Sequence, residues 1–142
     1  MNDDYIKLVD AIKNTDPYSR DNDFTKLKTI RTDPVTKGNL LLISKQLELP
    51  YAKIARYTVR NLSDHIPALT YKKILNTQII PNSDKNITSI RFWVNGELDR
   101  LIELRAKQLK TNQQHLINLI LYLFIADYKQ KRSTYLLNKQ EV

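Results

Sequence analysis

The chain has 142 residues, a formal net charge of +8 and no cysteine. This length allows one compact domain, or two very small units that share a core. The absence of cysteine excludes a disulfide scaffold, a thiolate metal site and a cysteine nucleophile. The two glycines, Gly38 and Gly96, are too few for a glycine-rich phosphate loop or a dinucleotide fingerprint. A pI near 9.6 favours a polyanionic partner such as nucleic acid.

Residues 1–25 form an acidic leader, which carries six Asp against three basic residues. Apolar side chains recur within it at helical spacing and predict a short amphipathic helix over 4–13; they are Tyr5, Leu8, Val9 and Ile12. The acidic start does not resemble a signal peptide. The longest apolar stretch, 116–125, has half the length that a bilayer requires. We therefore expect a cytoplasmic protein that does not use a membrane.

The next segment, 26–66, predicts a strand followed by two helices. Residues 26–32 include the strand formers Thr29 and Ile30. Asp33 followed by Pro34 is a strong helix start, with Asp as N-cap and Pro at the first helical position. We expect this helix to end near residue 47. A turn and a second helix over 51–66 follow.

The segment 88–131 predicts the same order of elements. Apolar and polar side chains alternate over 88–94, with Ile90, Phe92 and Val94 on the apolar face. Asn95 then caps a helix over 96–109, and Asn112 caps a long apolar helix over 113–131. A shift of 62 positions superposes all elements of the two segments, which indicates an internal duplication. Residues 67–87 form a linker between the segments, and residues 132–142 form a tail.

The residues at 90–98 (IRFWVNGEL) and 106–116 (AKQLKTNQQHL) carry a resemblance to a known family. Their alternating strand, capped helix and polar corner resemble the ribbon-helix-helix (MetJ/Arc) superfamily. Two such units in one chain look like the accessory DNA-binding proteins of conjugation and T-DNA transfer, among them relaxosome proteins. The resemblance implies a mainly α fold with a short two-stranded antiparallel ribbon, in which both units of one chain form a pseudo-dimer.

The resemblance also implies sequence-specific binding of double-stranded DNA, with the ribbon in the major groove. The outward strand residues would then contact bases; they are Leu27, Thr29, Arg31, Ser89, Arg91 and Trp93. The N-termini of the second helices would bind phosphates. The matching residues are Tyr51, Ala52 and Lys53 in the first segment, and Lys110, Asn112, Gln113 and Gln114 in the second. Because the two strands differ in sequence, we expect a non-palindromic target.

Two positions fit this scheme less easily. Trp93 is bulky for base contact, so packing in the core or an interface is an alternative. Lys28 falls on the inward face of its strand. Its ammonium must therefore reach the edge of the ribbon, or the strand must slip or bulge at that point.

No enzyme, cofactor or metal site is expected, because the chain offers no nucleophile–base pair and its two histidines, His65 and His115, lie far apart. The biological use would be plasmid-type DNA transfer, partition or transcriptional repression. One alternative is a protein-interaction module of antitoxin-like or regulatory type, with DNA binding secondary. Another is an all-α basic protein that binds RNA or a membrane face. The apolar helix at 116–125 also offers a surface for a homo-oligomer. A relaxosome or regulatory protein is a further candidate partner.

Overall fold

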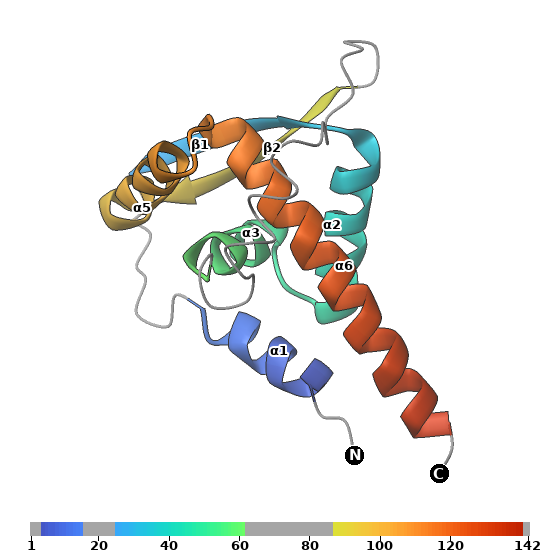
Figure 1. Ribbon diagram of the computed structural model, residues 1–142. Coiled ribbons are helices and arrows are strands. Elements are labelled where there is room, and N and C mark those ends of the chain that lie inside the picture. The colour runs from blue at the N-terminus through green and yellow to red at the C-terminus, as the bar shows by residue number, and fades with distance from the viewer. Residues whose placement is uncertain (1–3, 16–24, 62–86, 141–142) are drawn as a thin grey trace.

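The computed structural model describes residues 4–15, 25–61 and 87–140. These ranges are mainly helical and contain one two-stranded antiparallel sheet, called the ribbon below (Figure 1). The elements are α1 (Asp4–Lys13), β1 (Lys26–Thr32), α2 (Pro34–Leu47), α3 (Tyr51–Arg60), β2 (Thr88–Val94), α5 (Gly96–Gln108) and α6 (Gln113–Gln140). This confirms the predicted helical class with a short antiparallel ribbon. The elements β1, α2 and α3 are called the first half, and β2, α5 and α6 the second half.

Each strand passes into its helix through a side-chain cap. The Asp33 carboxylate accepts the Thr36 backbone N–H at 2.8 Å, and Pro34 is the first residue of α2. The Asn95 side chain likewise accepts the Leu98 N–H at 2.8 Å and begins α5. The two caps lie 62 positions apart. Both predicted helix starts are therefore confirmed, because each cap satisfies a backbone donor that the first helical turn leaves without a partner.

The turns between the two helices of each half have the same backbone geometry. Glu48 (φ 57°) and Lys110 (φ 56°) are left-handed, and they also lie 62 positions apart. The N–H that follows each of them bonds back over the helix end, from Leu49 to the Ser44 carbonyl at 3.1 Å and from Thr111 to the Ala106 carbonyl at 2.9 Å. These bonds close both helices in the same way.

The ribbon pairs seven residues of β1 with seven of β2, from Lys26 opposite Val94 to Thr32 opposite Thr88. Its inward side chains are buried over 28–32 and 90–94, and α1, α2, α3 and most of α6 lie below the ribbon in Figure 1. The main core cluster joins the inner face of the ribbon to residues of α1, α2, α3, α5 and α6. A smaller cluster, formed by Ala106, Leu116, Leu119 and Ile120, lies between α5 and α6. The apolar stretch at 116–125 is thus mostly core, as its composition indicates.

The helix α6 is longer than the sequence predicts, because it continues to Gln140 and includes most of the expected tail. Local and tertiary contacts stabilise the added turns. Lys131 pairs with Asp127 at 2.8 Å, one helical turn away. The Tyr135 ring lies 5.1 Å from the ring of Tyr5, so α1 packs against this part of α6. Figure 1 shows α6 running from the ribbon past α2 to the C-terminus.

The helix α3 ends earlier than predicted, at Arg60 rather than residue 66. The Asn61 side chain donates to the Tyr57 carbonyl at 2.8 Å and caps the last turn. Among the described residues of this helix, Ile54, Tyr57 and Thr58 face inward and are buried. The end of the first segment (62–66) and the predicted linker up to residue 86 lie outside the described residues.

Candidate nucleic-acid interface

The six predicted base-contacting side chains lie together on the outer face of the ribbon. Burial alternates over 27–32 and 89–94, where the outward positions are more exposed than their inward neighbours. The register places them in three cross-strand pairs: Leu27 with Trp93, Thr29 with Arg91, and Arg31 with Ser89. Trp93 is 48% exposed, so the alternative that it packs in the core is wrong. The ribbon therefore presents one continuous outer face.

This outer face is chemically uneven from end to end. One end carries the apolar pair of Leu27 (41% exposed) and Trp93. The other end pairs Arg31 with Ser89, and the centre pairs Thr29 with Arg91. Arginine donates two parallel hydrogen bonds to guanine, whereas an apolar group contacts the thymine methyl. The two ends thus offer different chemistry to a ligand.

The edges of the ribbon are held crosswise by the second helices. The Arg91 backbone N–H on β2 donates to the Tyr51 hydroxyl of α3 at 3.1 Å. The Arg31 N–H on β1 donates to the Gln114 side-chain carbonyl of α6 at 3.2 Å. Each strand is therefore fixed by a side chain from the other half of the chain.

The strand carbonyls are held crosswise in the same manner. Asn118 of α6 donates to the Arg31 carbonyl at 2.8 Å, and Arg56 of α3 donates to the Trp93 carbonyl at 3.4 Å. Donors 62 positions apart thus contact carbonyls 62 positions apart. The sequence does not reveal these contacts, because nothing in the local pattern links residue 118 to residue 31.

The predicted phosphate-binding residues lie at the two helix N-termini beside the ribbon. Asn112 and Lys110 are exposed, while the other predicted side chains are half-buried; these are Tyr51, Ala52, Lys53, Gln113 and Gln114. Asn112 caps α6 by accepting the His115 N–H at 2.7 Å, as predicted, whereas Pro50 gives α3 no side-chain cap. Backbone N–H groups and the positive end of the helix dipole make both termini suitable for an anion.

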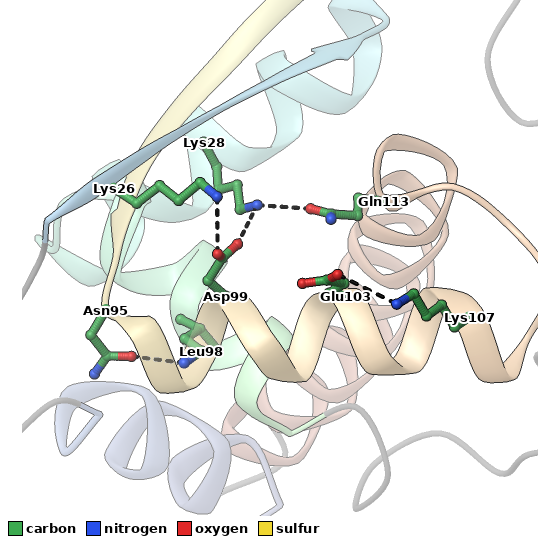
Figure 2. Close-up of polar contacts among 8 residues, drawn as sticks. All are labelled: Lys26, Lys28, Asn95, Leu98, Asp99, Glu103, Lys107 and Gln113. Atoms are coloured by element: carbon green, nitrogen blue, oxygen red, sulfur yellow. Dashed lines mark hydrogen bonds and ion pairs between the residues drawn. The ribbon is translucent and has the colours of Figure 1, made fainter.

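The buried Lys28 ammonium is neutralised by a carboxylate partner that the sequence alone does not reveal. Lys28 is 9% exposed, and its ammonium lies 2.5 Å from one carboxylate oxygen of Asp99 and 2.8 Å from the Gln113 side-chain oxygen (Figure 2). Lys26 donates to the other Asp99 oxygen at 3.0 Å. The described ribbon pairs continuously, so the alternative of a slip or bulge at this strand is wrong. The hydrogen bond from Lys28 and the weaker effect of Lys26 lower the pKa of Asp99 below its ordinary value, against the opposing effect of burial.

The sequence around Asp99 indicates only a favourable negative charge in the first turn of its helix. The signal that identifies its second role is Lys28 itself, because a lysine on an apolar strand face requires a carboxylate nearby. Lys107 does not reach toward the ribbon contacts in Figure 2 but pairs with Glu103 on α5 at 3.5 Å.

The described residues contain no cluster of metal-ligating side chains, and none of their helices is long and apolar enough to cross a membrane. His65 lies outside them, and His115 begins α6. Comparison of the chain with protein-family models, with curated proteins and with solved structures finds no match.

Proposed function

We propose that the protein is a sequence-specific binder of double-stranded DNA that inserts its ribbon into the major groove and has no catalytic activity. The observation that carries this proposal is the exposed outer face of the ribbon, with Arg31 and Arg91 among its side chains, between two helix N-termini. A two-stranded ribbon fits the width of the major groove. The flanking helix N-termini would then bind phosphates on either side.

A tandem ribbon-helix-helix arrangement, folded as a pseudo-dimer, is part of the proposal. The helix caps, the left-handed residues and the crosswise contacts to the strand carbonyls all recur at a spacing of 62. Thr29 and Arg91, which are also 62 apart, face each other at the centre of the ribbon. An approximate two-fold axis between them would relate the halves, as in a homodimer of single units.

The overall charge supports a polyanionic ligand. The net charge of +8 favours association with phosphates, and Lys53 and Lys110 lie near the two helix N-termini. We propose a cytoplasmic role as an accessory factor in plasmid-type or T-DNA-type transfer, or as a transcriptional repressor.

Selection of bound sites from random duplex DNA tests the proposal. We expect a defined motif to be enriched, and affinity for it to fall steeply as the salt concentration rises. Lys107→Ala is a suitable control, because it removes one exposed positive charge from α5 outside the proposed contact set. It should leave the enriched motif unchanged. Absence of any motif, together with tight binding to a co-purified protein, would favour the protein-interaction module instead.

A further inference from the structure

The buried cation on the inner face of the ribbon couples the two halves of the chain. Lys28 comes from β1 in the first half, whereas Asp99 and Gln113 come from α5 and α6 in the second half (Figure 2). Lys26, also on β1, contacts the same carboxylate. The charge complementarity therefore runs between the halves and not within either of them.

The related position on the other side of the ribbon has no such pair. A shift of 62 relates Lys28 to Ile90, Lys26 to Thr88 and Asp99 to Lys37. The Lys37 ammonium lies 3.5 Å from the Thr88 hydroxyl, which is the counterpart of the contact between Asp99 and Lys26. A lysine thus stands in the first half where the second half has its aspartate.

These identities decide which halves can pair. If the first halves of two chains formed a ribbon, the Lys28 and Lys26 ammonium groups would face Lys37 of a second copy, with no carboxylate at that position. If two second halves paired, the Asp99 carboxylate would face Thr88 and Ile90 of a second copy, with no ammonium. A buried charge without a partner is strongly unfavourable. Only the pairing of a first half with a second half satisfies both groups.

We propose that Lys28, Lys26 and Asp99 are specificity determinants that pair the first half of the chain with the second half and reject homotypic ribbons between copies. The proposal rests on the tandem arrangement given under the proposed function. It assigns a role to a charged cluster that lies on the inner face of the ribbon, opposite the proposed DNA-contacting face.

A charge swap tests this with the full chain, because Lys37→Asp combined with Asp99→Lys leaves the composition and the net charge unchanged. The swap places a carboxylate opposite Lys28 in a pair of first halves. It places a lysine opposite Thr88 in a pair of second halves, a combination that the native chain already tolerates. We expect the mass measured by light scattering to change from that of one chain, 16.7 kDa, to that of a dimer.

The absence of native cysteine allows disulfide reporters at the centre of the ribbon. Because the Arg91 N–H donates to Tyr51, residues 29 and 91 form a non-hydrogen-bonded pair, whose close side chains suit a disulfide. Thr29→Cys with Arg91→Cys should form a disulfide within one native chain. Either substitution alone should link two chains readily in the charge-swapped background, where identical positions face each other, and not in the otherwise native chain.

The matched control exchanges the exposed pair on α5, as Glu103→Lys with Lys107→Glu, and should remain monomeric. Lys37→Asp alone keeps the native Lys28–Asp99 pair and therefore its fold. At high protein concentration it should give roughly tenfold more interchain Thr29→Cys disulfide than Lys45→Asp, which changes an exposed charge on the same helix.

A folded, monomeric charge swap would overturn the inference, and so would interchain Thr29→Cys disulfides in the otherwise native chain. If the charge swap loses its helical circular dichroism, Lys37→Asp decides the matter, and equal cross-linking of Lys37→Asp and Lys45→Asp would then overturn it. None of these measurements uses DNA, so a failure here is distinguishable from a failure of the proposed DNA binding.

Discussion

A lysine on an apolar strand face is stable only if the protein supplies a counter-charge. Lys28 is 9% exposed and Asp99 is 18% exposed at its side chain, so each is costly to leave alone. We expect Asp99→Asn to lower the free energy of unfolding by about 1–3 kcal/mol, because it leaves the Lys28 ammonium without its carboxylate.

Urea unfolding of the single and double variants measures this coupling. Lys28→Ile, which copies the residue at position 90, should restore much of the stability in the Asp99→Asn background. Glu103→Gln, on the exposed side of the same helix, should change stability by less than about 0.5 kcal/mol. Additive effects of Lys28→Ile and Asp99→Asn would contradict the coupling.

The lowered pKa of Asp99 predicts how the free energy of unfolding changes at acid pH. Lys28 hydrogen bonding, followed by the effect of Lys26, lowers this pKa below 3.8 in the folded chain. The stabilisation is therefore present above pH 3.8 and is lost as the pH falls through the lowered value. Unfolding measured from pH 7 to pH 2 should show the wild type and Asp99→Asn converging at the acidic end. A difference that stays constant over this range would contradict the assignment.

On the outer face of the ribbon, the two arginines should each determine the preference for different bases of the DNA site. Arg91 lies at the centre of the ribbon opposite Thr29, and Arg31 lies at its polar end. We expect Arg91→Ala and Arg31→Ala each to weaken binding of the selected site by about 1–3 kcal/mol and to relax the preference at different bases. Binding titrations against single-base variants of the site measure this. Normal affinity and preference in both variants would rule out the ribbon as the reading element.

At the scale of the element, the sequence predicts helix starts and strand faces accurately, because these depend on residues that are close together in the chain. Asp33, Asn95 and Asn112 each cap a helix start where the sequence places one, because capping involves only neighbours within one turn. The alternation in both strands also identified the outer face of the ribbon. The contacts that the sequence did not reveal are long-range: the Lys28–Asp99 pair, the crosswise carbonyl contacts, and the packing of Tyr5 on Tyr135, which accompanies the longer α6.

Glycine should stabilise the chain by a similar amount at each of the two left-handed turn positions. Glu48 and Lys110 adopt φ values of 57° and 56°, which cost an ordinary residue more than they cost glycine. We expect Glu48→Gly and Lys110→Gly each to raise the free energy of unfolding by about 0.5–1 kcal/mol. The controls Lys45→Gly and Lys107→Gly, also 62 apart but inside helices, should lower it by about 1 kcal/mol. Thermal or urea unfolding reports both, and destabilisation at the turn positions would contradict the geometry.

At the scale of the whole molecule, the two halves have similar backbones but different side chains at equivalent positions. A shift of 62 relates Arg31 to Trp93 and Leu27 to Ser89, so equivalent outward positions differ in charge and size. A homodimer reads matched half-sites, because both of its reading surfaces are identical. The pseudo-dimer proposed here would instead read two different half-sites.

We therefore expect the motif enriched from random DNA to be non-palindromic and to bind one chain per site. Two palindromes should then be built, each from one half-site and its inverted repeat. Each should bind more weakly than the composite site by about 1–3 kcal/mol for every base pair that loses its matching side chain. One palindrome lacks the half-site that Arg31 reads. Arg31→Ala should reduce the difference in binding free energy between the composite site and this palindrome, because the variant no longer contacts the bases of that half-site. A palindromic enriched motif, or equal affinity for all three duplexes, would mean that the uneven outer face does not determine the sequence that is read.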